Sequence, residues 1–250
     1  MNVASWPPME SNTRDKPASV RERRFDSPAA LVATIAADVA RSLQSAIDER
    51  GQASLVVSGG TTPVPLFRAL REIALPWEHV SVTLADERWV ALDDASSNEG
   101  LVRRELVTGA ASAAKLIGLR TPPPTAQQGA AQSWQRLEAI ARPFDVVVLG
   151  MGDDGHTASL FPGSPGIAAA LDPSAAPACV AMSAPAAPNA RLSLNLAALL
   201  QARRVLLHIT GARKWQVYRD AAAAAASGLS SPPIAAVLRS GSGVQVCWSP

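Results

Sequence analysis

The stretch VVVLGMGDDGHTASLFPGS, residues 146–164, decides the fold class and locates the candidate site. It begins with a valine-rich apolar run, which is typical of a strand buried on both faces. Glycines, aspartates and a histidine follow at once, so this strand ends in a tight polar loop. Such strands belong to parallel sheets covered by helices, and we therefore expect similar strands elsewhere in the chain.

Short segments rich in β-branched residues recur along the chain, and helical patterns separate them. The predicted strands lie at 54–60, 80–87, 144–152, 204–211 and 244–248, and a further alternating strand begins at Arg191. The predicted helices lie at 28–50, 63–74, 98–107 and 125–141. This alternation predicts an α/β three-layer sandwich with a mainly parallel central sheet and helices on both faces. We expect the segment 172–190, rich in alanine and proline, to be a surface connection.

The composition is that of a globular chain. Of its 250 residues, 48% are hydrophobic and 18% are charged, which differs clearly from the composition of disordered chains. This length allows one large domain with a full core. Residues 1–20 are rich in proline, serine, asparagine and charge, so we predict a mobile N-terminal tail followed by a single domain over residues 21–250.

The charge balance argues against a polyanionic partner. Lysine and arginine number 23 against 21 for aspartate and glutamate, and a net charge of +2 gives no general attraction for nucleic acid. We interpret the RERR run at 21–24 as a solvated strand or charge run, with a basic arm as the alternative. We expect no nucleic-acid partner and no obligate protein partner.

The sequence favours a cytoplasmic location without a membrane partner. No segment approaches the roughly 20 uninterrupted apolar residues that cross a bilayer, and the N-terminus lacks a secretory signal pattern. Cys179 and Cys247 lie far apart without CxxC spacing, which indicates neither a disulfide framework nor a zinc cluster. We therefore expect a reducing compartment and no metal site.

The segment SGGTTP at 58–63 has the features of a phosphate cradle. It follows a predicted strand and precedes a predicted helix, whose N-terminus favours an anion. Gly59 and Gly60 allow backbone amides to approach a ligand closely, and Thr61 adds a hydroxyl. Neither the P-loop pattern nor the GxGxxG pattern is present here, and an ordinary tight turn is the alternative interpretation.

The segment ADER at 85–88 ends the next predicted strand. It brings Asp86, Glu87 and Arg88 to the same edge of the sheet, where ligands of open α/β folds bind. A carboxylate beside a guanidinium can orient a hydroxyl together with a carbonyl or phosphate oxygen. The alternative is a simple ion pair within the loop. Farther on, SSN at 96–98 fits the cap of the following helix.

His156 is the candidate base of the opening segment. An imidazole of ordinary pKa, about 6.5, accepts a proton near neutral pH, and a neighbouring carboxylate can fix its tautomer. Asp153 or Asp154 can serve as that carboxylate. No GxSxG or HExxH pattern accompanies the histidine, so activation of water is the simplest chemistry. We interpret the other histidines, His79 and His208, as structural residues within strands.

Two basic residues complete the candidate site. Arg191 opens the alternating strand in PNARLSLNL, and Lys214 lies in the first turn of a predicted helix after Gly211. A cation at a helix N-terminus is repelled by the positive end of the helix dipole. An anion bound between the cation and the helix N-terminus would explain this placement. The alternative for Lys214 is a solvated surface position.

Taken in order, these segments resemble the 6-phosphogluconolactonase family. The resemblance runs from about residue 25 to 248, and the long central motif is highly specific. It is carried by SGGTTP, ADER, SSN, VLGMGDDGHTASLFPGS, PNARLSL and ITGARK. It implies the fold shared with glucosamine-6-phosphate deaminases, an α/β sandwich on a mainly parallel sheet. The chain departs from the family in LSLNL, where a threonine-rich strand is more usual, and in its N-terminal tail.

The resemblance also implies a reaction and residue roles. The family hydrolyses 6-phospho-D-glucono-1,5-lactone to 6-phospho-D-gluconate in the oxidative pentose phosphate pathway, without a metal or an organic cofactor. By motif, His156 matches the general base, which we expect Asp154 to support. Asp86 and Arg88 match positions that bind and polarise the substrate. The phosphate would lie against Arg191, Lys214, Gly59, Gly60 and Thr61.

Two other functions fit the same residues. A glucosamine-6-phosphate deaminase or isomerase would use the same phosphate cradle and a histidine for ring opening. TASLFPGS after His156 favours the lactonase over that enzyme. A non-catalytic sugar-phosphate-binding regulator is the second alternative, and the presence of every expected catalytic side chain argues against it.

Overall fold

The computed structural model describes residues 20–183, 189–240 and 243–250. Its main sheet has the strand order β1-β10-β9-β6-β2-β3-β5, and every neighbouring pair is parallel. The strands are β1 (Arg21–Arg24), β2 (Ala53–Val57), β3 (Val80–Leu84), β5 (Lys115–Ile117), β6 (Val146–Leu149), β9 (Val205–Thr210) and β10 (Val244–Ser249). The tail predicted for residues 1–20 lies outside the described residues, apart from Val20.

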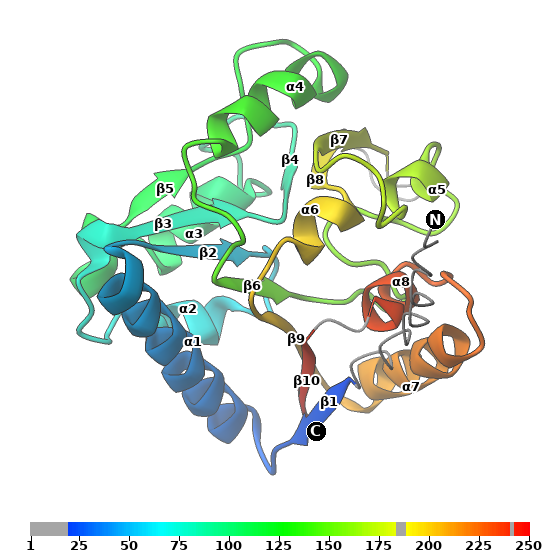
Figure 1. The fold of residues 1–250 in the computed structure, drawn as a ribbon, viewed down its shortest axis with the longest axis horizontal. Coiled ribbons are helices and arrows are strands. Elements are labelled where there is room, and N and C mark those ends of the chain that lie inside the picture. The colour runs from blue at the N-terminus through cyan, green and yellow to red at the C-terminus, as the bar shows by residue number, and fades with distance from the viewer. Residues whose placement is uncertain (1–19, 184–188, 241–242) are drawn as a thin grey trace, which may run out of the picture.

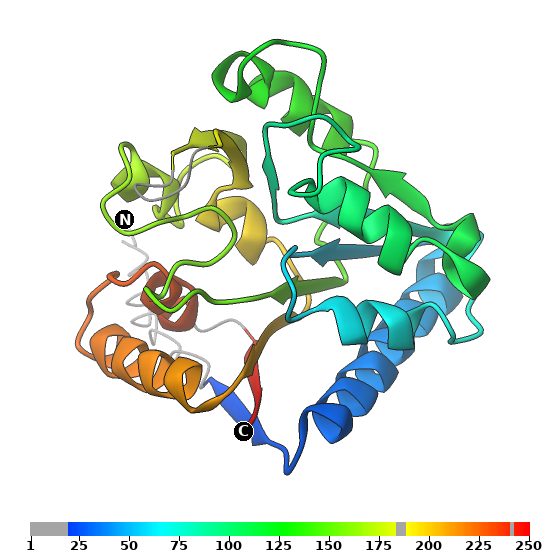
Figure 2. The same ribbon diagram turned by 180° about the vertical axis from the view of Figure 1, so that it is seen from behind.

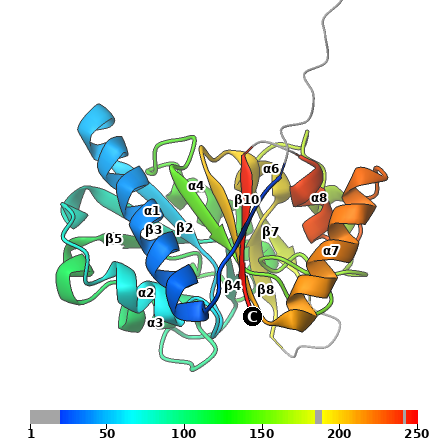
Figure 3. The ribbon, with the colours of Figure 1, turned by 90° about the horizontal axis from the view of Figure 1, so that it is seen from below.

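Helices cover the main sheet on both faces, which confirms the predicted fold class (Figure 1). Figure 3 shows α1 on one side of β1 and β10, with α7 and α8 on the other. Seen from behind, α2 and α3 lie in front of the sheet and so cover the same face of it (Figure 2). The helices are α1 (Pro28–Arg50), α2 (Val64–Leu70), α3 (Asn98–Glu105), α4 (Ala126–Leu137), α5 (Ile167–Ala170), α6 (Leu196–Leu200), α7 (Ala212–Ala226) and α8 (Ile234–Arg239), with 3-10 turns at Trp77–His79 and Gly109–Ala113.

A second, antiparallel sheet was not predicted. Its order is β4-β8-β7, with β4 (Asp86–Arg88), β7 (Cys179–Met182) and β8 (Arg191–Leu194). Strand β7 falls inside 172–190, so the interpretation of that whole segment as a surface connection is wrong. The ADER segment turns directly from β3 into β4, because Ala85 separates the two strands. This turn carries Asp86 and Arg88 out of the main sheet and over the ends of its strands.

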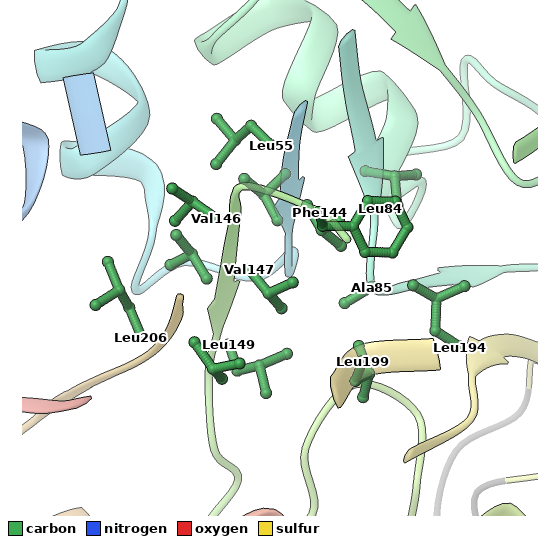
Figure 4. Close-up of a cluster of buried hydrophobic side chains, with 14 of the residues drawn as sticks. Leu55, Leu84, Ala85, Phe144, Val146, Val147, Leu149, Leu194, Leu199 and Leu206 are labelled. Carbon is green, nitrogen blue, oxygen red and sulfur yellow. The ribbon is translucent and has the colours of Figure 1, made fainter. Parts of the chain in front are cut away.

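The buried apolar side chains form a connected cluster around β6. In Figure 4, β6 side chains lie among those of its neighbouring strands, while Leu194 and Leu199 approach from β8 and α6. Helix α1 is long and apolar enough to span a membrane by length and composition. However, Leu31, Ile35 and Val39 on one of its faces are buried against the cluster, as expected for a core helix.

A network of charges fastens edge strand β1 to α1. The buried Asp38 carboxylate of α1 accepts hydrogen bonds from Arg23 of β1 and from Arg41, the latter at 2.9 Å. Arg204, just before β9, lies 3.4 Å from the same carboxylate. Burial alone would raise the pKa of Asp38, but these arginines outweigh it and lower that pKa below its usual range. The carboxylate therefore joins three segments that are distant in the sequence.

The strand order reverses between β2 and β6. From β2 the chain continues outward to β3 and β5, and it then returns to β6 on the other side of β2. Loops that leave neighbouring strands in opposite directions open a crevice at the carboxyl ends of those strands. The glycine-rich loops after β2 and β6 both begin there, so the fold predicts where a ligand binds.

Candidate active site

A cleft of about 260 Å³ lies at this reversal point. The loops after β2 and β6 form its walls together with β4, β8 and the start of α7. It brings together eight of the sequence-predicted site residues, which are Gly59, Gly60, Thr61, Asp86, Arg88, His156, Arg191 and Lys214. Asp154, the remaining predicted residue, lies behind His156. The structure thus assembles residues that are separated by up to about 150 positions in the sequence.

The structure distinguishes the two candidate carboxylates next to His156. Nδ1 of His156 lies 2.5 Å from Oδ1 of Asp154, and the same oxygen accepts a hydrogen bond from the His156 backbone N–H at 3.0 Å. Burial raises the pKa of Asp154, but these hydrogen bonds outweigh it and lower that pKa. Asp153 instead forms an ion pair with Arg213, at 3.3 Å. Asp154 is therefore the partner of His156.

The His156 ring fits into a restricted space. Its centroid lies 4.3 Å from that of the Phe161 ring. A Cβ atom on Gly152 would come within 2.1 Å of Cε1 of His156, so only glycine permits this ring position. Next to the histidine loop, Ala158 has a φ of 49°, a left-handed conformation that costs a non-glycine residue free energy. The loop conformation is thus maintained by its surroundings.

Asp86 is buried and held in a fixed orientation. Ser159 donates a hydrogen bond of 2.6 Å to one carboxylate oxygen. The Asn98 amide donates to the Asp86 backbone carbonyl at 2.9 Å and lies 3.4 Å from the second carboxylate oxygen. These contacts leave Asp86 with little freedom to turn away from the cleft. The predicted position of Asp86 at the sheet edge agrees with the structure.

Glu87, expected at the same edge, points away from the cleft. Its carboxylate accepts hydrogen bonds from the backbone N–H groups of Arg88, Asn98 and Glu99, each at 2.7 Å. Burial raises the pKa of Glu87 despite these donors. Glu87 and Ser97, the N-cap residue of α3, thus hold the start of that helix. The sequence prediction of SSN as a helix cap agrees with this arrangement.

Arg88 and Arg191 form a cationic wall. They occupy opposite positions in the antiparallel pair of β4 and β8. Burial lowers the pKa of Arg191, and the nearby positive charge of Arg88 lowers it further. The two neighbouring positive charges repel each other, whereas an anion bound between them would be attracted to both. This wall can therefore receive an anionic group.

The loop after β2 and the start of α7 complete the cleft. A Cβ atom on Gly59 would come within 1.9 Å of the Asn98 side-chain oxygen, so the loop approaches α3 as closely as only glycine allows. Lys214 lies in the first turn of α7 and is half-buried, with no ion pair among the described residues. This end of the cleft also suits an anion.

Unpaired polar atoms gather around the cleft. Buried side-chain atoms without a hydrogen-bond partner in the described protein belong mostly to residues that line it: Ser58, Arg88, Asn98, Arg191 and His208. Ser58, Asn98 and His208 were not predicted as site residues. A single polar residue in an apolar strand or at a helix cap carries no functional signal in the sequence. Only the fold shows that these three residues line the cleft. Among the described residues, no group of three or more His, Cys, Asp or Glu side chains could hold a metal.

The model of the family described as glucosamine-6-phosphate isomerases/6-phosphogluconolactonase matches residues 26–248. The chain belongs to this family. Its resemblance to 6-phosphogluconolactonases is therefore confirmed, and all nine predicted site residues lie in the matched region.

Individual family members are similar over most of their length. A 6-phosphogluconolactonase of Pseudomonas aeruginosa is 48% identical over 79% of this chain and 83% of its own. One of Pseudomonas putida is 42% identical over 94% and 95% of the two chains. The crystal structure of a 6-phosphogluconolactonase from Shewanella baltica is 44% identical, with a TM-score of 0.87, over 94% of this chain and 99% of its own.

Proposed function

We propose that this chain hydrolyses 6-phospho-D-glucono-1,5-lactone to 6-phospho-D-gluconate, as a 6-phosphogluconolactonase of the oxidative pentose phosphate pathway. The contact of 2.5 Å between Nδ1 of His156 and Asp154, inside a cleft lined by cations, carries the proposal. A base that faces a cationic cleft is suited to hydrolysis of an anionic ester. The names of the family members that share most of the chain support the same substrate.

His156 is the proposed general base. An ionised carboxylate only accepts hydrogen bonds, so Nδ1 of His156 must carry the proton that is shared with Asp154. In the neutral imidazole Nε2 then carries no proton, and it can accept one from water as that water attacks the lactone carbonyl. Asp154 stabilises the imidazolium that forms. The same proton can return to the ring oxygen when the ester bond breaks, which needs no metal and no covalent intermediate.

The remaining residues orient the substrate and stabilise charge. We assign the lactone end to Asp86 and Arg88, because the fixed Asp86 carboxylate can accept from a sugar hydroxyl while Arg88 polarises the carbonyl. Arg191, Lys214 and the loop at Gly59, Gly60 and Thr61 bind the phosphate. Binding energy from the distant phosphate then positions the reacting carbonyl beside His156.

The proposal is tested by hydrolysis of freshly prepared lactone, with the spontaneous rate subtracted. We expect the wild-type protein to be well above background and His156→Gln to be slower by about 10² or more. The His156→Gln variant should still bind 6-phosphogluconate. The prediction that His79 lies within a strand is wrong, because His79 is exposed in a 3-10 turn. It does not line the cleft, so His79→Gln is the matched control.

Each alternative function predicts a different result. A wild-type protein that only matches background but converts glucosamine 6-phosphate would be the deaminase or isomerase. A protein that binds 6-phosphogluconate without converting either substrate would be the regulator. Equal activity of the wild type and His156→Gln would keep the lactonase and remove His156 as its base.

A further inference from the structure

His208 lies in the cleft but has no role in the mechanism above. It belongs to β9, is 2% exposed, and lines the cleft together with Gly150 and Lys214. Neither Nδ1 nor Nε2 has a hydrogen-bond partner within the described residues. Its neighbours in the strand, Leu207 and Ile209, are apolar and buried. The sequence interpretation of His208 as a structural strand residue thus accounts for its position but not for its unpaired nitrogens.

A purely structural histidine is expected to have a partner. Buried polar groups are nearly always hydrogen-bonded, because an unpaired one loses its hydration without compensation. Packing alone would be served by a leucine at this position, as it is by Leu206 two residues earlier on the same face of the strand. A polar ring that borders the cleft and lacks a protein partner points to a partner that binds in the cleft.

The protonation state of His208 limits what it can bind. Burial lowers its pKa, and the positive charge of Lys214 lowers it further, to about 4. The imidazole is then neutral at neutral pH, with one nitrogen donating and the other accepting. A neutral donor can stand beside Lys214 without adding to the positive charge there. This combination suits a phosphate oxygen, which can take one bond from each.

We propose that His208 binds the substrate phosphate, donating a ring N–H to a phosphate oxygen beside Lys214. This inference rests on the proposed function, which places the phosphate at Lys214 and the loop that follows β2. Lys214 lies only six residues beyond His208, across the turn from β9 into α7. His208 is therefore a specificity residue for the phosphorylated substrate and takes no part in the proton transfer at His156.

Replacement of His208 by leucine, compared with glutamine, tests the role. For His208→Leu we expect the KM for the phosphorylated lactone and the Kd for 6-phosphogluconate to rise about tenfold or more, with kcat within about threefold. His208→Gln, which retains an N–H donor, should recover part of the affinity. Glucono-1,5-lactone, which lacks the phosphate, should be hydrolysed equally by all three proteins. His79→Leu is the control outside the cleft.

An NMR measurement on the wild-type protein removes any dependence on how the variants fold. The chain has three histidines, so the ring nitrogen signals are readily assigned. We expect inorganic phosphate and 6-phosphogluconate to shift the His208 ring N–H signal and slow its exchange, while the His79 signal stays unchanged. An unchanged His208 signal at saturating ligand would overturn the proposal.

Other outcomes also decide against this role. Unchanged KM and Kd in a folded His208→Leu protein would make His208 a packing residue. An equal loss with both lactones would place it at the sugar ring, and a lower kcat at unchanged KM would place it in the chemical step. If the wild-type protein hydrolyses no lactone, the proposed function fails separately, and the response of His208 to inorganic phosphate still decides the binding role.

Discussion

At the scale of single residues, two adjacent aspartates of the GDDGH loop have different tasks. Asp154 holds His156 at 2.5 Å, whereas Asp153 pairs with Arg213 on the surface. Both side chains are about half exposed, so their environments differ mainly in their partners. This neighbouring pair provides an internal control for the role of a carboxylate beside the histidine.

We expect Asp154→Asn to lower kcat/KM for the lactone by about 10- to 100-fold. An amide can still contact the His156 ring, but it has no charge to stabilise the imidazolium. Asp153→Asn should stay within about twofold of the wild type. Steady-state kinetics of both variants checks this, and equal effects of the two substitutions would contradict the assignment of Asp154.

Gly152→Ala should impair catalysis more than stability. The added methyl group would come within 2.1 Å of Cε1 of His156, so the ring must leave its position beside Asp154. We expect kcat to fall at least about tenfold, since misplaced catalytic groups lose large factors in rate. Thermal unfolding should show that the variant folds. Wild-type kcat in a folded Gly152→Ala protein would mean that the ring position is not essential.

Which residues lie at the cleft was predictable from sequence only where polar residues cluster. His156 stands among glycines and aspartates, and these neighbours led to its prediction as a site residue, although sequence alone did not choose between Asp153 and Asp154. His208 lies within the apolar run VLLHIT, which gives no such signal. The phosphate-site assignment of Arg191 and Lys214 remains a prediction, although the structure does bring both residues to the cleft.

At the scale of elements, long periodic segments were predicted best. Helix α1 has the predicted bounds, because Ser27 caps its start and Gly51 ends it in a left-handed conformation. Strands β4, β5 and β7 have only three or four residues and were not predicted as separate strands. Such short strands exist through pairing with distant segments, and local sequence does not encode that pairing.

The Asp38 network gives a prediction for stability. Asp38→Asn should lower the free energy of unfolding by about 2–3 kcal/mol at pH 7, because Arg23 and Arg204 would lose their shared carboxylate. Asp48→Asn is the matched control on the same helix. Asp48 is exposed and, within the part of the chain that the structure describes, its side chain is hydrogen-bonded only to Gln44, so a change within about 0.5 kcal/mol is expected.

The same network predicts a pH dependence. The pKa of Asp38 in the folded protein lies below its usual value near 3.8. Its contribution is therefore fully present above that value, and it is lost as the pH falls through the lowered pKa. Urea unfolding should show the difference between wild type and Asp38→Asn shrinking below about pH 4. A difference that stays constant to pH 2 would contradict the lowered pKa.

At the scale of the whole molecule, the net charge is small while the cleft is locally cationic. The net charge of +2 gives little general field, but Arg88, Arg191 and Lys214 converge on one crevice. The reversal of strand order explains this concentration. It was not predictable in detail, because the order of parallel strands depends on packing among all of them.

Salt should therefore act on the phosphorylated substrate alone. Raising the ionic strength from about 0.05 to about 0.5 M should increase KM for 6-phosphogluconolactone several-fold, because screening weakens the attraction of the cleft. KM for uncharged glucono-1,5-lactone should change little over the same range. Parallel titrations of both substrates check this, and equal responses would show that the cleft charges do not bind the phosphate.

The outermost strands of the main sheet have a consequence for self-association. A sheet edge presents unpaired backbone groups to which a strand of another molecule can add. On one edge, β1 consists of the four charged residues RERR. A strand of another molecule that paired with β1 would have to accommodate these charges. On the other edge, β5 has three residues, one of them a lysine, too few for an extended ladder. We therefore expect the charge of β1 and the shortness of β5 to limit the addition of further strands to this parallel sheet.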